Sequence, residues 1–550
     1  MGSELPDINC PIGHKRAISI VSGACVYFFL AGRAFLPHLG IQTDEAIFVA
    51  GIYQVQDAYY KVQIFHHLIP LMILSYLGTL KSFTYALLFQ MFTPNAASTR
   101  MPVLLVGVLS IVLFYRLLAR ISGRVAAIAG CLLLATDSIF LLTDLFDWGP
   151  AAFQHLLLVA GMLLLYRFYE SGRLGLLAGG FFLFGLAMWD KALFAWTLSG
   201  LAVAAAIVFP RVLWRLLGWR TAAVAGLGFL LGAAPLVMFN IHSKGETFRG
   251  NTAWSAEEFT HKLRMAQGTL EGQGLFGYLV RDDNEGAPPR AARTTLARGS
   301  ERLSHAFGAP RRNLMPAALA GALLLVPLLW RARTRASRTI LFAVIVLLVA
   351  WPQMAFNRNT GGSVHHVVLL WPFPHLIIAV AFGEAAQKFG RAGKAALALM
   401  LALVIPSNLL VTNEYYRMMM RNGGGLPWTD AIYPMADFLK HSYASQILVI
   451  DWGMFDSLQL LDRGKLPLRN GGDPLNKPSL DASDRETVRQ WLITPGTVFV
   501  AHTAPYEFLQ GSNQRLEDVA RQCGMARESL GVFKDRNGRA IYEVFRYAAN

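Results

Sequence analysis

Long apolar stretches, separated by short polar connections, recur along most of the chain. Each stretch covers roughly 16 to 20 residues, about the length that a helix needs to cross a 30 Å hydrocarbon core. The pattern therefore predicts a polytopic α-helical membrane protein with about 11 transmembrane helices. The predicted spans lie near residues 17–36, 101–119, 125–142, 150–168, 174–189, 192–209, 221–239, 314–330, 339–356, 366–382 and 395–412.

Positive charges are unevenly distributed over the connections between these spans. Every second connection is basic, and short basic connections are retained on the cytoplasmic side of a membrane. The N-terminus is therefore expected in the cytoplasm, and an odd number of crossings places the C-terminus on the opposite, outer side. The basic residues concerned are Lys15, Arg16, Arg116, Arg120, Arg124, Arg167, Arg173, Arg211, Arg215, Arg220, Arg331, Arg333, Arg335, Arg338, Lys388, Arg391 and Lys394.

The same threading places two long loops, 37–100 and 240–313, and a short acidic turn on the outer side. The first loop contains two moderately apolar stretches, IFHHLIPLMILSYLGTL and FTYALLFQMF, which are interrupted or short. We expect them to lie along the membrane interface as helices, although two further crossings there would give about 13 spans in the same orientation. The polar 240–313 loop is expected to be partly mobile.

From about residue 413 the composition becomes that of a soluble protein. QILVID and TVFVAH read as buried strands around the helix-like DRETVRQWL, a helix is expected to begin near Thr429, and GVFKDRNGRAIYEVFRY predicts a hairpin that turns near Asn537 and Gly538. We therefore expect a membrane domain over 1–412 and a small soluble α/β domain over 425–550.

Composition agrees with this class of protein. The chain is 54% hydrophobic and only 15% charged, values that exclude an ordinary soluble protein. Its net charge of +15 does not indicate nucleic-acid binding, because the cations lie between the apolar stretches. The four cysteines show no paired spacing, so neither a disulfide framework nor a zinc site is predicted.

The first candidates for chemistry are the adjacent carboxylates of Asp44 and Glu45 in TDEAIF, just after the first span. A carboxylate there could take a proton from an acceptor hydroxyl as it attacks C1 of a sugar and phosphate leaves. The alternative is a solvated loop start or a helix cap. A second acidic site is formed by Asp144 and Asp147 before the fourth span, where acidic residues are also ordinary.

Two cations are candidates for binding a phosphate. Arg100 precedes the second span and offers a guanidinium fork suited to a phosphate oxyanion, or it simply extends toward the interface. Lys191, next to Asp190, lies between two apolar stretches, where unpaired charges cost roughly 2.5 to 3.5 kcal/mol each. An ion-paired hairpin at the surface is the alternative for that pair.

Paired histidines, His66 with His67 and His365 with His366, could contact an acceptor or ligate a metal together with Asp44 or Asp147. Neighbouring side chains on a helix point about 100° apart, so at most one of each pair faces a given site. A metal site is therefore not favoured, although binding of a divalent metal is not excluded by the sequence.

These features together resemble the GT-C superfamily of integral membrane glycosyltransferases, nearest to its protein O-mannosyltransferase and aminoarabinose transferase branch. Four segments carry the resemblance in order: TDEAIF, TRMPVLLVGVLSIVLFYRLLARISGRVAAIAGCLLLATDSIFLL, the acidic turn, and GLAMWDKALFAW. The resemblance implies a GT-C fold for the membrane domain. The C-terminal part is similar to the soluble tail of bacterial relatives.

The resemblance also implies roles for particular residues. Asp44, with Glu45 as its companion, corresponds to the catalytic base, and Arg100 to the contact with the donor's phosphate. Lys191 looks like the lysine of the family's GLA-x-x-x-K pattern.

Two further correspondences are looser. Either Asp144 or Asp147 matches the acidic position of the second outer turn. FHHLIP stands where aminoarabinose transferases carry an acidic-lysine-proline motif, so His66 or His67 would replace that motif near the acceptor.

The expected function is therefore sugar transfer from a polyprenyl-phosphate donor to a lipid, glycan or protein acceptor on the periplasmic face of a bacterial inner membrane. Direct displacement by one base would invert the anomeric centre and require no cofactor. The alternatives are a transporter or flippase of a lipid-linked saccharide, and a scaffold whose outer domain binds a partner. For the enzyme, some catalysis is expected to survive removal of the residues beyond about 425.

Overall fold

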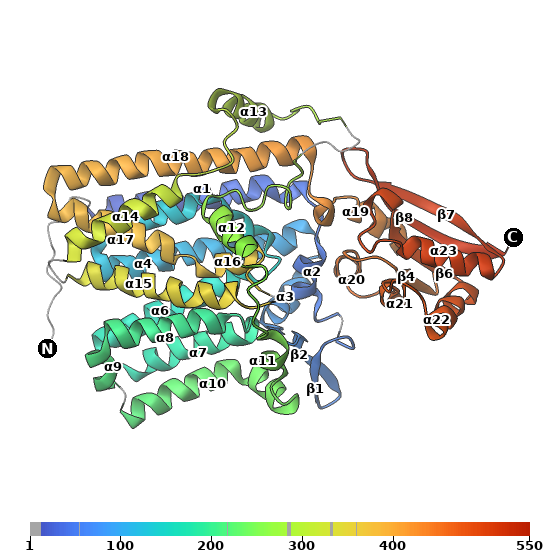
Figure 1. Cartoon of the computed structure of the whole chain (residues 1–550), viewed down its shortest axis with the longest axis horizontal. Helices are drawn as coiled ribbons and strands as arrows, with labels where there is room; N and C mark the ends of the chain where they lie inside the picture. Colours follow the sequence, from blue (N-terminus) through green and yellow to red (C-terminus); the bar gives the residue numbers. More distant parts are fainter. Residues whose placement is uncertain are drawn as a thin grey trace.

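The computed structural model describes residues 13–53, 55–216, 218–282, 288–330, 334–358 and 360–549. A bundle of long helices occupies one side of the molecule and a smaller sheet domain the other (Figure 1). The helices of the bundle are α1 (His14–Phe35), α4 (Ala96–Thr136), α5 (Ser138–Phe146), α6 (Ala151–Ser171), α7 (Leu174–Asp190), α8 (Phe194–Val208), α9 (Pro210–Leu216), α10 (Trp219–His242), α14 (Met315–Trp330), α15 (Arg335–Ala355), α16 (Val364–Val367), α17 (Phe373–Lys388) and α18 (Gly390–Asn422).

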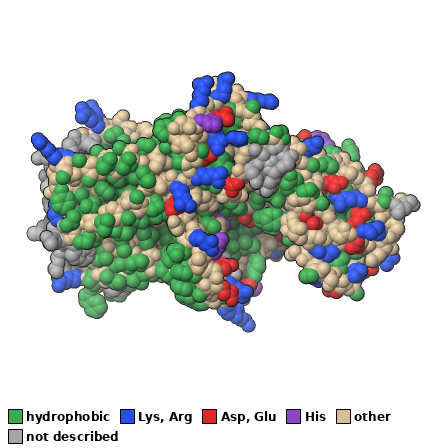
Figure 2. All heavy atoms as spheres, turned by 45° about the horizontal axis from the view of Figure 1, so that its top comes forward, with side chains coloured by type: hydrophobic (Ala, Val, Ile, Leu, Met, Phe, Trp, Pro, Cys, Tyr) green, Lys and Arg blue, Asp and Glu red, His purple; other side chains and the backbone are tan. Residues whose placement is uncertain are grey.

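The bundle has the surface of a membrane protein. Among the described residues, seven helical segments are long and apolar enough to cross a bilayer, and three shorter apolar helices accompany them. Hydrophobic side chains cover most of the bundle's visible surface, a few Lys and Arg side chains lie at its far end, and most charged side chains lie from the middle of the molecule over the sheet domain (Figure 2). The polytopic helical fold is confirmed, and the number of crossings stays a prediction.

Helix α4 consists of two antiparallel arms. Gly123 interrupts it with φ of 83°, a conformation that glycine adopts without steric cost. The Cys131 thiol, in the second arm, donates a hydrogen bond over 3.5 Å to the carbonyl of Ile111 in the first. The arms therefore lie side by side, and they correspond to the predicted spans near 101–119 and 125–142.

Basic connections meet at one end of the bundle. Arg120 pairs with Glu170 at 2.7 Å, Arg335 donates to the Tyr166 hydroxyl at 3.3 Å, and Lys388 binds the Leu328 carbonyl at 2.8 Å. We call this the basic end. The opposite end, which carries the two long loops and the sheet domain, is called the loop end.

The first loop contains α2 (Thr43–Ala50), β1 (Tyr60–Ile64), β2 (His67–Leu74), β3 (Leu77–Gly78) and α3 (Leu80–Met91). FTYALLFQMF is helical as predicted, but the helix expected for IFHHLIPLMILSYLGTL is wrong, because this stretch forms most of a three-stranded antiparallel sheet. Pro70 lacks the N–H that a helix interior needs. With 8 and 12 residues, α2 and α3 are shorter than a membrane crossing requires.

The second loop is more structured than its polar sequence indicates. It contains α11 (Glu246–Asn251), α12 (Phe259–Leu270) and α13 (Thr295–Phe307). Residues 283–287, within the DDNEGAPPRAAR stretch, lie outside the described part of the chain.

The C-terminal part forms the predicted small α/β domain. Its sheet has the order β5-β4-β6-β8-β7, in which β4 pairs in parallel with β5 and β6, and β8 is antiparallel to β6 and β7. The strands, the helix and the hairpin proposed from the sequence are all present. The elements are α19 (Ile432–Lys440), β4 (Gln446–Val449), α20 (Phe455–Leu461), β5 (Leu468–Asn470), α21 (Gly472–Leu475), α22 (Ala482–Ile493), β6 (Thr497–His502), α23 (Ser512–Gln522), β7 (Met525–Lys534) and β8 (Ala540–Ala549).

This domain shares a hydrophobic core with the first loop. Helix α20 packs on α2, where the Thr43 hydroxyl donates to Asp456 at 2.7 Å and the Ser457 hydroxyl donates to the Ile41 carbonyl at 2.9 Å. Val49 of α2 and Leu458 of α20 belong to the same buried cluster. The shared core argues against the expectation that catalysis survives removal of the residues beyond about 425, since that deletion would expose the apolar side of α2.

Substitution Leu458→Ala tests this packing. Leu458 is fully buried, so the cavity left behind should cost about 2 to 5 kcal/mol and lower the midpoint of thermal unfolding in detergent. The control is Leu399→Ala, because Leu399 is 61% exposed on the bundle surface. Equal midpoints for both variants would show that α20 is not part of a core with α2.

Candidate active site

The candidate site begins at the N-terminus of α2. The Gln42 side chain caps this helix by accepting a hydrogen bond from the Glu45 amide, and it donates to the Asp44 carboxylate, both at 3.0 Å. Successive residues on a helix point about 100° apart. The Glu45 side chain therefore points into the protein and is 1% exposed, whereas the Asp44 side chain stays partly open to solvent.

Glu45 is held by Arg100, the residue expected to contact a phosphate. The guanidinium binds both carboxylate oxygens of Glu45, through Nε at 2.7 Å and Nη2 at 2.8 Å. Its remaining N–H groups go to the carbonyls of Leu36 and Leu39 at 3.1 Å and of Gly40 at 2.6 Å.

These bonds use all five N–H donors that an arginine has, and the side chain is fully buried. Arg100 thus has no donor left for a phosphate in this arrangement. The phosphate role expected for it is corrected to a positioning role: Arg100 fixes Glu45 and the turn that precedes α2.

The Asp44 carboxyl group is largely buried. Burial raises the pKa of this group, and the hydrogen bond from Gln42 and the charge of Lys191 oppose this shift without cancelling it. Two phenols, Tyr76 and Tyr278, lie close enough to be affected by its charge. Burial is the larger cause that raises their pKa, and the negative charge of Asp44 is the next. A carboxylate with a raised pKa is better suited to accept a proton than an exposed one.

Lys191 follows the last residue of α7 and is 2% exposed. Its backbone pairs with Leu77 of β3, and the next amide, that of Ala192, donates to the Tyr76 carbonyl at 2.9 Å. The Lys191 ammonium donates to the Gly149 carbonyl at 2.8 Å. An ammonium has three N–H donors, so this bond leaves capacity for a ligand.

Lys81 is a buried cation that the sequence interpretation missed. Its ammonium binds Asp147 twice, at the carboxylate over 2.7 Å and at the carbonyl over 3.1 Å. The other carboxylate oxygen of Asp147 accepts the amide of Ala152 at 3.0 Å and so caps α6. The signal was a single lysine within the apolar stretch LGTLKSFTYALL, where a charge is costly unless it is paired.

Asp144 has different partners from Asp147. Its carboxylate lies 2.8 Å from Nδ1 of His155, whose Nε2 lies 2.8 Å from the Val368 carbonyl. A carbonyl only accepts, so Nε2 carries a proton, and the contact with Asp144 requires one more proton between the two side chains. Asp144 is fully buried in the bundle. The structure therefore does not unite Asp144 and Asp147 in one acidic site.

The two histidine pairs occupy different places. His365 and His366 form part of α16 at the loop end, where the His365 ring packs over Gly149: a Cβ on that glycine would lie 2.5 Å from the ring. His66 and His67 lie exposed at the tip of the β1–β2 hairpin. The structure thus does not bring His66 and His67 to the other candidates.

Three candidates do converge: Asp44, Lys191 and His365. Lys191 and His365 both contact Gly149, and the Lys191 charge reaches Asp44. Within the described ranges, no group of three or more His, Cys, Asp or Glu side chains is arranged to hold a metal ion. The cluster offers a partly open carboxylate that lies within reach of the charge of a buried ammonium, which suits proton abstraction near a developing negative charge.

An aromatic wall stands beside this cluster. The rings of Trp148, Tyr278 and Trp428 lie 5.5 to 6.2 Å apart, and Trp148 also contacts the His365 ring at 5.8 Å. These residues come from the acidic turn, the second loop and the entry to the C-terminal domain. The wall therefore joins these three segments to one another.

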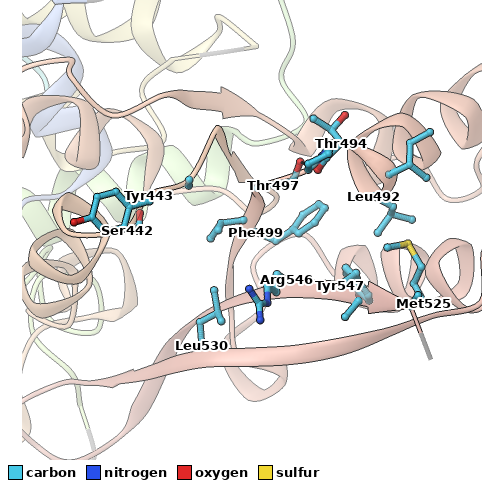
Figure 3. A pocket seen from close by; sticks show the side chains of 17 residues that line it. Ser442, Tyr443, Leu492, Thr494, Thr497, Phe499, Met525, Leu530, Arg546 and Tyr547 are labelled. Carbon is cyan, nitrogen blue, oxygen red and sulfur yellow. Dashed lines mark hydrogen bonds between the residues drawn. The ribbon is translucent and has the colours of Figure 1, made fainter.

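A separate cavity of about 540 Å³ lies in the C-terminal domain, at the amino ends of β4 and β6 (Figure 3). It is lined by side chains such as Leu492, Phe499, Met525 and Leu530. None of the predicted site residues lines it, so it is not part of the candidate active site.

Comparisons with known proteins bear on the family and on the fold. Residues 79–239 match the family model described as dolichyl-phosphate-mannose-protein mannosyltransferase. This segment contains Lys81, Arg100, Asp147 and Lys191 but not Asp44. No curated protein sequence is significantly similar to the chain.

Solved structures resemble the whole chain. ArnT from Cupriavidus metallidurans bound to undecaprenyl phosphate is 13% identical with a TM-score of 0.56, and the match covers 97% of this chain and 98% of that one. The apo oligosaccharyltransferase of Archaeoglobus fulgidus is 14% identical with a TM-score of 0.52, over 98% and 75%. The GT-C fold expected from the sequence is confirmed.

Substitution Arg100→Lys tests the positioning role. A lysine has three donors in place of five, and each buried acceptor left without a partner costs about 1 to 3 kcal/mol, so the midpoint of thermal unfolding should fall clearly. Arg120→Lys is the control, because the Arg120–Glu170 pair is largely exposed. An unchanged midpoint for Arg100→Lys, together with weakened binding of a polyprenyl phosphate, would restore the phosphate role.

Proposed function

We propose that this protein is a membrane glycosyltransferase that moves a sugar from a polyprenyl-phosphate donor to an acceptor at the loop end of the bundle. The observation that carries the proposal is the pairing of Asp44, a partly open carboxylate, with the charge of Lys191, a buried ammonium with free donor capacity that reaches it through space. The GT-C fold supports the same class of reaction. Lipids, glycans and proteins all stay open as acceptors.

Related structures support the class of donor. ArnT from C. metallidurans is described with undecaprenyl phosphate, and AglB from A. fulgidus, with a TM-score of 0.50 at 12% identity, is described with dolichol-phosphate and an inhibitory peptide. Both ligands are polyprenyl phosphates. We extend this ligand class to the present chain because its site offers a buried cation whose charge reaches a carboxylate.

In the proposed reaction, Asp44 accepts the proton of an acceptor hydroxyl or amine as that group forms a bond to C1 of the sugar. The bond between C1 and the phosphate oxygen breaks, and its electron pair leaves with the phosphate. Lys191 stabilises the charge that grows on this oxygen, which lowers the barrier. Displacement in one step inverts the anomeric centre and needs no cofactor.

The position of the basic end indicates on which side of the membrane the reaction takes place. Since short arginine-rich connections are retained in the cytoplasm, we place the basic end there and the loop end in the periplasm of a bacterial cell. The N-terminus is then cytoplasmic and the C-terminal domain periplasmic. A flipped polyprenyl-phosphate sugar would present its anomeric carbon at the loop end.

Substitution Asp44→Asn removes the proposed base. Release of polyprenyl phosphate from a radiolabelled polyprenyl-phosphate sugar by the purified protein should fall by about 10² to 10⁴-fold. The control is Asp57→Asn, because Asp57 is an exposed carboxylate in the same loop. Full activity of Asp44→Asn would remove Asp44 from this role.

A wild-type protein that moves the label across vesicles without releasing lipid phosphate would be a flippase.

Substitution Lys191→Met separates charge from packing. It keeps the unbranched chain but removes the ammonium, so the turnover rate should fall about 10² to 10³-fold while the unfolding midpoint changes little. Lys191→Arg should retain part of the rate because it keeps the charge. Equal rates for wild type and Lys191→Met would place the phosphate elsewhere.

A further inference from the structure

Helix α13 lies against the outside of the bundle, across α18 (Figure 1). Ser304 donates a hydrogen bond to Glu414 at 2.8 Å, and Asn413 donates to Ser304 at 3.0 Å and to the Ser300 carbonyl at 3.1 Å. The docked face of α13 is thus small and polar. The other faces of α13 point away from α18.

One flank of α13 is apolar. Leu296, Leu303 and Phe307 are 56%, 40% and 60% exposed. Their spacing of seven and four residues places the three side chains within about 40° of one another around the helix axis, since each residue advances by about 100°. They form a narrow stripe beside the docked face.

The opposite flank is basic. Arg298, Arg302 and His305 are all exposed, and the same geometry places them about 120° to 180° from the centre of the apolar stripe. Basic side chains also gather where α13 projects at the top of Figure 2. A helix that docks through one side and lies across a membrane-spanning helix presents one flank toward the bilayer and the other toward water.

Contacts with α18 show the depth of α13. The apolar part of α18 ends near Thr412, and Asn413 makes the contact with α13. After α13 the chain moves inward, because the Leu314 amide binds the hydroxyl of Ser407 at 3.0 Å. Exposed Leu314 therefore continues the apolar surface of the bundle. Helix α13 lies at the border between this surface and the polar loop end.

We propose that α13 is an interfacial helix that binds the surface of the bilayer. The stripe of Leu296, Leu303 and Phe307 enters the leaflet at the loop end, and Arg298 and Arg302 bind the phosphates of anionic lipid headgroups. We choose the bilayer as the partner of the stripe because the stripe adjoins the lipid-facing surface of the bundle. This inference does not depend on the proposed glycosyl transfer.

Such an anchor would act on the candidate site. The segment after α13 is tied to the second loop, since the Asn313 amide binds the Glu271 carbonyl at 2.8 Å. The same loop carries Tyr278, which senses the charge of Asp44. Lipid binding by α13 therefore steadies the loop that carries Tyr278.

Neighbouring residues on the two flanks provide a matched test. Leu303→Cys and Arg302→Cys are made in the full chain with its four native cysteines replaced, labelled with a nitroxide and placed in nanodiscs of phosphatidylglycerol and phosphatidylcholine. In power-saturation measurements, the label at Leu303 should be relaxed mainly by oxygen, which concentrates in hydrocarbon. The label at Arg302 should be relaxed mainly by a water-soluble nickel chelate.

Equal relaxation of both labels by the nickel chelate, or the reverse pattern, would overturn the insertion of the stripe. The headgroup contact is tested separately with the double variant Arg298→Gln and Arg302→Gln. Its enrichment in co-purified phosphatidylglycerol over phosphatidylcholine should fall, by up to roughly fivefold for each arginine removed. An unchanged enrichment would overturn the contact between these arginines and lipid phosphate.

Discussion

The loop end depends on one buried ion pair, Arg100 with Glu45. A guanidinium and a carboxylate both lose their hydration in this position, a cost that is met only when every donor and acceptor is paired. Arg100 meets that condition with five bonds, two to Glu45 and three to the carbonyls of the turn before α2. The pair therefore fixes the start of α2 against α4. Since Asp44 is the neighbour of Glu45, its direction is fixed by the same contact.

The C-terminal domain holds α2 from the other side. The bond between Thr43 and Asp456, and the core shared by α2 and α20, place the domain next to the proposed base. A catalytic group lowers the barrier most when its dipoles are oriented before the reaction begins. The domain is thus part of the site's scaffold, which explains why a soluble α/β unit belongs to a membrane protein of this fold.

Local sequence patterns were enough for the features that depend on burial or on turn residues alone. Long apolar stretches predicted the helical bundle, and the Asn537–Gly538 turn predicted the last hairpin. Short stretches were ambiguous: IFHHLIPLMILSYLGTL is long enough for either structure, and its strands are stabilised by pairing that no local pattern reveals. The partners of Arg100 and Lys81 come from segments 55 and 66 residues away, so their roles required the fold.

Donor capacity distinguishes the three buried cations of the site. Arg100 has all five N–H groups bonded within the protein, and Lys81 uses two of its three on Asp147. Lys191 uses one, on the carbonyl of Gly149, and it is also the cation whose charge reaches Asp44. A phosphate oxygen that gains charge as a bond breaks needs a donor that is not already committed. Among these three, Lys191 satisfies that requirement best, whereas the other two serve to hold α2 and the acidic turn around it.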